Sequence, residues 1–263
     1  MTEVLLINNN RYLRPGIKTR HIYFGSEFCG HLLPGFRDIK NLDCLRKKYG
    51  IEFSVVTPYV NETHLNKVGP LLTRLDSDYP GTEVIINDWG VFNLVRKKHK
   101  TLKPVLGRLL SRQKRGFFTI VNKKIRDIHS IKLSPEDTVY LSSSILQNDA
   151  ILKFLSLNGI DRIGLDCTPF GALMQKTPLN IDLYYPYTYI TTTNYCLTAM
   201  AKPKNTADKR IDVCGKPCLT RRPKQVIINR KRMILYGNTQ FYINKGSIKK
   251  LLPLINRLVI PVF

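Results

Sequence analysis

Four cysteines are the residues of this chain best suited to bind a metal or a cluster. Cys214 and Cys218 flank a Gly-Lys-Pro turn, and seventeen residues separate Cys196 from this pair. A Cys-x3-Cys pair on a turn with Gly and Pro offers two thiolates to one ion or cluster. Cys196 adds a third thiolate, and Cys29 is available as the fourth ligand that a [4Fe–4S] cluster requires.

Three interpretations of these cysteines stay open. Besides an iron–sulfur cluster, four cysteines are a standard ligand set for a structural zinc ion, and they could also be unrelated free thiols. Two further cysteines compete for a ligand role. Cys44 lies in a segment expected to be helical, so we predict that it is buried, and Cys167 follows a predicted strand and could replace one of the four.

The composition fits one globular domain inside the cell. The chain has 263 residues, of which 43% are hydrophobic, enough to bury one sizeable core. No apolar run reaches the roughly eighteen residues of a membrane helix, and Val4–Ile7 is too short for a signal peptide. We therefore expect a cytoplasmic protein without a membrane span, in which the six cysteines are reduced.

Lysine and arginine are in large excess. They number 42 against 19 acidic residues, which gives a formal net charge of +23. Such an excess attracts polyanions, so RNA or an anionic small molecule is a candidate partner. The lysine pairs at 47–48, 97–98, 123–124 and 249–250 are also typical of solvated surfaces, and no RNA-binding signature with interleaved aromatic residues is present.

Short buried strands alternate with amphipathic helices along most of the chain. Asn61 and Asp88 are predicted helix caps, and a later helix ends at Gly159. Repeated βα units indicate a parallel sheet covered by helices, and about eight such strands favour an α/β fold of the TIM-like (β/α) barrel type, with a doubly wound sheet as the second choice. The predicted strands of this sheet are Thr2–Asn8, His21–Gly25, Glu52–Thr57, Glu83–Asn87, Lys103–Gly107, Thr138–Ser142, Arg162–Asp166, Asn180–Tyr185 and Arg257–Val262.

Two regions depart from a regular barrel. The segment Asn9–Arg20 is too short for a crossover helix, so the first helix is predicted to be missing or reduced to a loop. A final helix is predicted at Ser247–Asn256. We expect a single domain over residues 1–263, with a cysteine-rich loop at 194–222 and a β-rich part at 223–263. The β-rich part is predicted to contain an antiparallel meander of Gln225–Ile228, Met233–Tyr236 and Gln240–Ile243.

Polar side chains and cysteines gather after the predicted strands. Glu27 and Cys29 follow the second strand, Asp88 follows the strand at 83–87, and Arg108 follows the next. In a barrel, active groups come from the loops at the C-terminal ends of the strands. Cys29 and Cys196 are therefore expected on one face, which favours a ligand set of Cys29, Cys196, Cys214 and Cys218.

Three segments carry a resemblance to a known family. They are His21–Cys29 (HIYFGSEFC), Glu83–Gly90 (EVIINDWG) and the block from Cys196 through Cys214-x3-Cys218, in this order. Together they resemble the collagenase-like peptidase family, family thirty-two of the unassigned peptidases, and most of all its UbiV-type iron–sulfur branch.

The resemblance implies a barrel-like fold and a [4Fe–4S] cluster bound by one early cysteine, matched by Cys29, and three late ones, matched by Cys196, Cys214 and Cys218. It also implies oxygen-independent hydroxylation of a small molecule or an RNA base, with prephenate as oxygen source, and a paralogous heterodimer partner. The chain would be the cluster-bearing subunit of such an enzyme.

Two alternatives stay open beside this interpretation. The first is a basic RNA-binding protein stabilised by zinc or a cluster, and the second is a true collagenase-like peptidase. Protease activity is not expected, because neither a nucleophile elbow nor a His-Glu-x-x-His motif is present.

Four residues are candidates for substrate contacts. Arg108 and Arg112, with Arg115 beside them, could bind a carboxylate such as that of prephenate, because guanidinium groups bind carboxylates bidentately. Glu27 and Asp88 are candidates at neighbouring strand ends. The alternatives are a solvated basic loop for the arginines and a helix cap for Asp88.

Overall fold

Eight parallel strands close into a barrel in the order β1-β14-β9-β8-β5-β4-β3-β2. This computed structural model describes residues 1–14, 16–116, 118–121, 124–127, 132–174, 177–194, 196–200, 214–228, 231–244 and 246–263. The predicted TIM-like barrel is therefore confirmed, and the doubly wound alternative is wrong. The barrel strands are β1 (Thr2–Ile7), β2 (His21–Gly25), β3 (Glu52–Val56), β4 (Glu83–Ile86), β5 (Lys103–Leu106), β8 (Arg162–Asp166), β9 (Asn180–Tyr184) and β14 (Arg257–Val262).

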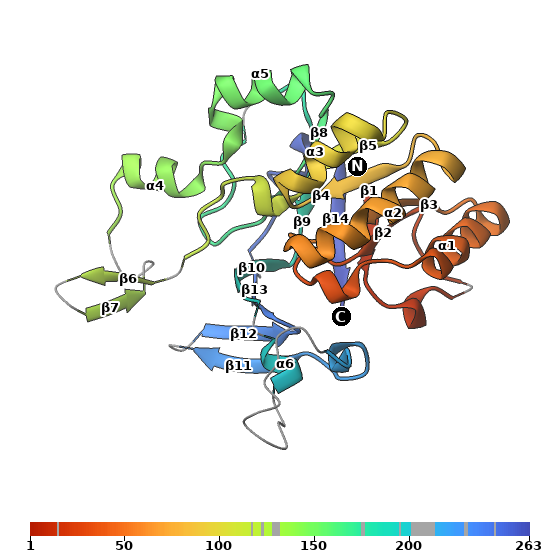
Figure 1. The fold of residues 1–263 in the computed structure, drawn as a ribbon. Helices are drawn as coiled ribbons and strands as arrows, with labels where there is room; N and C mark the ends of the chain where they lie inside the picture. The colour runs from red at the N-terminus through yellow and green to blue at the C-terminus, as the bar shows by residue number, and fades with distance from the viewer. Residues whose placement is uncertain are drawn as a thin grey trace.

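Helices cover the outside of the barrel (Figure 1). Asn61 caps α2 by accepting a hydrogen bond from the His64 N–H at 3.0 Å, and Asp88 caps α3. Their apolar faces pack against the outer strand residues in one large core cluster. The helices are α1 (Phe36–Tyr49), α2 (Glu62–Asp78), α3 (Trp89–Lys98), α4 (Pro135–Ser142), α5 (Asp149–Leu157) and α6 (Leu197–Met200).

The first barrel helix is missing, as predicted. Between β1 and β2 the structure has one 3₁₀ turn, Asn10–Tyr12, within the described residues. Parallel pairing of β14 with β1, in a register that joins Thr2 to Arg257, closes the barrel.

A second sheet lies against the C-terminal end of the barrel strands, below the barrel in Figure 1. It contains the predicted meander and one additional strand from the segment after β9. The strands run antiparallel in the order β10-β13-β12-β11, with β10 at Tyr187–Thr192, β11 at Lys224–Ile228, β12 at Lys231–Tyr236 and β13 at Thr239–Ile243. A hairpin of β6 (Phe118–Val121) and β7 (Lys124–Asp127) extends to one side with α4.

Two predicted elements are wrong. Residues 138–142 form the second half of α4 and not a strand, because Ser134 and Asp137 make a capping box with Pro135 at the first helical position. The predicted helix Ser247–Asn256 is instead a series of turns with a 3₁₀ turn at Leu252–Leu254. Pro253 lacks the N–H that a continuous helix would need there.

The barrel interior has a separate apolar core. Its cluster joins side chains of seven barrel strands, and Tyr23 and Tyr184 are its largest members. Within the described residues, no helix is long and apolar enough to cross a membrane. The interior cluster consists of Val4, Leu6, Tyr23, Val56, Ile85, Val105, Tyr184 and Val259.

Candidate cluster-binding pocket

The four predicted ligands line one pocket between the barrel and the second sheet. Cys29 follows β2, Cys196 precedes α6, Cys214 follows the segment 201–213, and Cys218 lies in a 3₁₀ turn. The pocket has an empty volume of about 640 Å³, open solvent at its mouth included. The cysteine-rich loop predicted at 194–222 lies partly outside the described residues, which exclude 195 and 201–213.

Backbone N–H groups face the sulfur atoms of these cysteines. The Ala199 N–H donates to Cys196 Sγ and the Lys216 N–H to Cys214 Sγ, each at 3.4 Å. The His31 N–H approaches the Cys29 thiol in the same way. Such donors stabilise a thiolate and tune the potential of a bound cluster, because they place partial positive charge at the sulfur.

Apolar side chains shield Cys218 from water and form one wall of the pocket. Cys218 is buried in a cluster with Phe28, Tyr236 and Phe241, and Cys29 packs against it. The Phe28 and Phe241 rings meet edge to face at 5.5 Å between their centroids. This apolar wall lowers the local dielectric, so charge on the sulfur atoms is costly unless a metal or cluster compensates it.

The pKa values of the thiols reflect this environment. Burial raises the pKa of Cys29 to about 11 and that of Cys218 to about 12, and the neighbouring cysteines add to both shifts. Burial also raises the pKa of Cys196. These thiols are protonated at neutral pH, so a metal or cluster must displace their protons on binding.

Among the described residues, no three or more His, Cys, Asp or Glu side chains are arranged to hold one metal ion.

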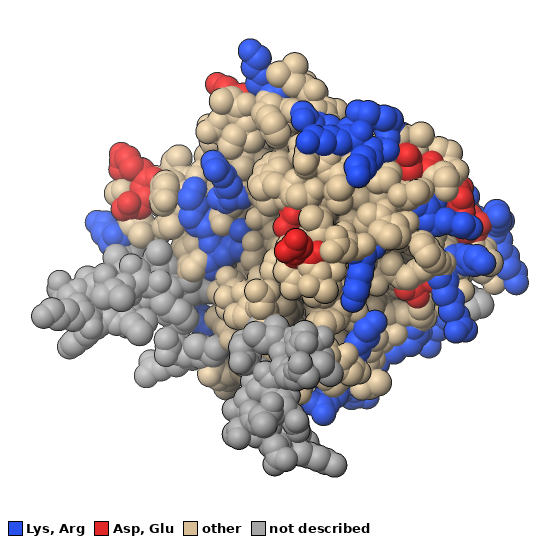
Figure 2. Space-filling model, viewed as in Figure 1, with Lys and Arg blue, Asp and Glu red and all other residues tan. Residues whose placement is uncertain are grey.

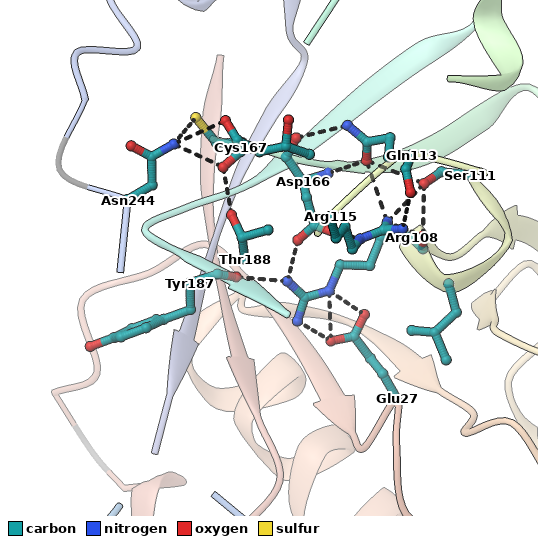
Figure 3. A network of polar contacts seen from close by, with 12 residues as sticks. Glu27, Arg108, Ser111, Gln113, Arg115, Asp166, Cys167, Tyr187, Thr188 and Asn244 are labelled. Atoms are coloured by element: carbon teal, nitrogen blue, oxygen red, sulfur yellow. Dashed lines mark hydrogen bonds and ion pairs between the residues drawn. The ribbon is translucent and has the colours of Figure 1, made fainter. Parts of the chain in front are cut away.

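A buried ion-pair network, drawn in Figure 3, contributes Glu27 and Arg108 to the pocket lining. Arg108 is completely buried, and its Nε donates to both carboxylate oxygens of Glu27 at 2.9 and 3.1 Å. Its Nη2 donates to Glu27 Oε2 at 2.6 Å, and its Nη1 donates to Asp166 Oδ1 and to the carbonyl of Tyr187, both at 2.8 Å.

Asp166 is saturated by a second set of contacts. Arg115 Nε donates to Asp166 Oδ2 at 2.8 Å, and Gln113 accepts from the Asp166 N–H at 2.7 Å and donates to its carbonyl at 2.9 Å. Burial opposes the charge of Arg108, but the carboxylates of Glu27 and Asp166 outweigh it and raise the pKa of the guanidinium. The Tyr184 ring also lies 4.2 Å from the Arg108 Cζ.

The substrate candidates occupy different places. Arg108 and Glu27 line the pocket, where they pair with each other. Arg112 is exposed, and its φ of 56° places it in left-handed backbone. Asp88 caps α3, with its Oδ1 accepting from the Gly90 N–H at 2.7 Å. A substrate contact by any of these four stays a prediction.

The strand-end rule selects Asp166, at the end of β8, from the sequence, but it gives this residue no role beside Arg108. The sequence argument missed Gln113 as a member of the network. Gln113 gives no sequence signal, because its role depends on the fold of the loop after β5.

The two competing cysteines lie outside the pocket. Cys167 is buried, and Asn244 Nδ2 donates to its carbonyl at 2.9 Å and approaches its Sγ at 3.2 Å. Cys44 is exposed on α1, so the prediction of burial is wrong. Its neighbours Leu42 and Leu45 face the core, which turns the side chain at position 44 toward solvent.

Comparison of the chain with models of known protein families, with curated proteins and with solved structures finds no match.

Proposed function

We propose that the pocket binds a [4Fe–4S] cluster through Cys29, Cys196, Cys214 and Cys218. The observation that carries this proposal is the convergence of four cysteines from distant parts of the chain on one largely apolar pocket. The backbone N–H groups at Cys29, Cys196 and Cys214 support it, because they prepare these sulfur atoms for negative charge.

Four thiolates suit either a [4Fe–4S] cluster or a zinc ion, so the donor set alone does not choose between them. The resemblance to the iron–sulfur branch favours the cluster. The cysteines share their pocket with Phe28, Tyr236 and Phe263. Glu27 is neutralised by Arg108, so the wall adds no uncompensated negative charge to the thiolates.

We propose further that the chain is the cluster-bearing part of an oxygen-independent hydroxylase acting on a small molecule or an RNA base. This rests on the resemblance to the collagenase-like peptidase family alone. A bound cluster would supply one-electron chemistry. The residues of this chain would bind it, exclude water and hold the surrounding charges, and a paralogous partner would complete the active site.

Anaerobic purification with a visible spectrum and iron and sulfide analysis tests the cluster. We expect a brown protein with about four iron and four sulfide per chain. Replacement of any one of Cys29, Cys196, Cys214 or Cys218 by serine should reduce the iron content. A colourless protein that carries only zinc, or no metal after reconstitution, would contradict the proposal.

Two cysteine variants provide matched controls. Cys44→Ser changes an exposed thiol on α1, and Cys167→Ser changes a buried thiol outside the pocket. Both should keep the iron content of the unmodified chain. A loss in Cys44→Ser as large as that in Cys29→Ser would refute the ligand set.

The hydroxylation needs a separate experiment in the source cell. Deletion of the gene during anaerobic growth should remove one hydroxyl group from a quinone or an RNA nucleoside, detected by mass spectrometry as a loss of one oxygen atom. The unmodified chain should restore the product and Cys29→Ser should not. An unchanged set of quinones and nucleosides would contradict the hydroxylase role and leave the cluster result standing.

A further inference from the structure

A second hollow lies beside the N-terminal end of β5, away from the cysteine pocket. It is bordered by the ends of α3 and α5 and has an empty volume of about 1150 Å³, open solvent included. Among the residues that the structure describes, no acidic side chain lines it. Its basic lining residues are Arg96, Lys97, Lys100 and Lys103.

The positive charge of this hollow is not neutralised by carboxylates. Arg96 Nη1 donates to the neutral amide of Asn158 at 2.9 Å, and Lys100 donates to a backbone carbonyl. Within the described part of the chain, no ion pair joins Lys97 or Lys103 to a carboxylate. Figure 2 shows basic side chains gathered over the end of α3.

The carboxylate of Asp76, on a neighbouring helix, belongs to a different contact. Asp76 on α2 faces His99, with its Oδ2 3.7 Å from His99 Nδ1, and it accepts hydrogen bonds from Thr101. The Asp76 carboxylate is therefore already paired with His99 and Thr101. The hollow keeps a net positive charge, which is the setting that phosphate groups require.

Exposed aromatic rings continue this surface along α3 and α5. Trp89 is 46% exposed and Phe154 41% exposed, and their ring centroids are 6.0 Å apart. Trp89 lies seven residues before Arg96, so the two share one face of α3, about 10 Å apart along the axis. The pairs Trp89–Phe154 and Arg96–Asn158 thus connect the helices at two levels.

We propose that this surface, the α3–α5 seam, binds single-stranded nucleic acid. The phosphates would occupy the basic hollow, and bases would stack on Trp89 and Phe154. Aromatic platforms next to a cationic groove are the combination that single strands use. The cations line a hollow rather than a raised surface, which suits a strand that places its phosphates inside it.

This site is independent of the cluster, and it goes beyond the proposed function. Titration of the full chain with an oligouridylate of about twelve nucleotides tests it, with binding followed by the fluorescence of Trp89, the only tryptophan. Four phosphate contacts predict a slope of log K against log salt of about −2.8, so binding weakens roughly 50-fold between 50 and 200 mM salt.

Three variants locate the site. The triple variant K97A/K100A/K103A should reduce the salt slope by about two, because three phosphate contacts are lost. Trp89→Ala, followed by a labelled oligonucleotide, should weaken binding roughly tenfold through loss of stacking. The control triple variant K18A/K40A/K48A removes the same charge from exposed positions elsewhere and should keep the slope.

Several outcomes would overturn the proposal. One is a salt slope of log K that is unchanged in K97A/K100A/K103A. Another is a reduction of this slope in K18A/K40A/K48A as large as that in K97A/K100A/K103A. Anionic phosphatidylserine vesicles that bind the chain while the oligonucleotide does not would assign the surface to a membrane instead. Cys29→Ser should bind the oligonucleotide normally, so failure of the cluster proposal and failure of this one are distinguishable.

Discussion

Two arginines face two carboxylates at each end of the barrel interior, and the two ends differ in burial and in what they connect. At the C-terminal end all four side chains are at most 9% exposed, whereas three of the four at the N-terminal end are 14–19% exposed. The C-terminal network contains Glu27, Arg108, Arg115 and Asp166, and the N-terminal network contains Glu83, Arg162, Asp182 and Arg257.

The N-terminal network joins residues at or near the N-terminal ends of several barrel strands. Arg257 Nη1 donates to Glu83 Oε2 at 2.6 Å and to the Tyr23 hydroxyl at 2.7 Å, and Arg162 Nη1 donates to Asp182 at 2.7 Å. These contacts hold the strands together at the end where barrels carry stability rather than catalysis.

The C-terminal network connects the barrel to the second sheet and the cysteine pocket. Arg108 reaches the Tyr187 carbonyl at the start of β10, and Glu27 lies two residues before Cys29. Each network therefore has two arginines and two carboxylates, but one joins strands to each other and the other joins the barrel to the cysteine pocket. The two ends have the same charge composition and differ in the segments that the charges connect.

The two ends should differ most in how much stability is lost when one of their arginines is replaced. Arg108→Met leaves Glu27 and Asp166 buried without their main partner, so we expect the free energy of unfolding to fall by about 3–5 kcal/mol. Arg257→Met should cost less, about 1.5–3 kcal/mol, because Glu83 is 19% exposed and keeps Arg162 at 3.5 Å. Urea unfolding at pH 7 measures both.

The exposed Arg112 provides the control for this comparison. Arg112→Met should change the free energy of unfolding by less than about 0.5 kcal/mol, as expected for a surface substitution. If Arg108→Met were as mild as Arg257→Met, the two ends would be equivalent and the special role of the C-terminal network would be wrong.

The N-terminal end should also respond to pH through His21. Burial, with a smaller contribution from the positive charge of Arg257, lowers the pKa of His21 from 6.5 to about 4. The carboxylate of Glu83 raises this pKa but does not outweigh them. Folded His21 is therefore neutral where the unfolded chain binds a proton. Its contribution to stability is complete above pH 6.5 and decreases as the pH falls toward 4, by up to about 3 kcal/mol.

His21→Gln tests this pH dependence, because glutamine keeps a hydrogen-bonding group near Ser54, which lies 2.8 Å from His21 Nε2. Urea unfolding from pH 7 to pH 4 should show a steeper loss of stability for the unmodified chain than for the variant. If the free energy of unfolding changed with pH equally in both proteins, His21 would not be the cause of the pH dependence.

The barrel could be predicted from the sequence because its strands are short, buried and bounded by turn or cap residues. The error at 138–142 has a local cause. Thr138 and Val139 favour a strand by type, but the capping box of Ser134 and Asp137 fixes a helix, and tertiary packing did not reverse it. The strand Tyr187–Thr192 was not predicted, because its pairing with β13 is non-local.

The pocket could be predicted in part for a related reason. The position of Cys29 follows from the rule that strand ends share one face of a barrel, and Cys214 and Cys218 are close in sequence. The pairing of Arg108 with Glu27 could not be predicted, because they lie 81 positions apart in the chain and either could equally face a ligand. Only the side-chain packing assigns Arg108 to the carboxylates of the protein itself.

The smallest predicted effect concerns Asp88, which shares the C-terminal end with Arg108 but lies outside the pocket lining. Its Oδ1 accepts hydrogen bonds from the Gly90 and Val91 N–H groups at 2.7 and 3.3 Å. Asp88→Ala should therefore lower the free energy of unfolding by about 1 kcal/mol, whereas Asp88→Asn should be nearly neutral, because asparagine caps helices equally well. Urea unfolding checks both variants, and the product assay of the deletion strain complements it. If Asp88→Asn kept its stability but failed to restore the hydroxylated product, Asp88 would belong with the site and not with the scaffold, and the boundary between the two at this end of the barrel would have to be moved.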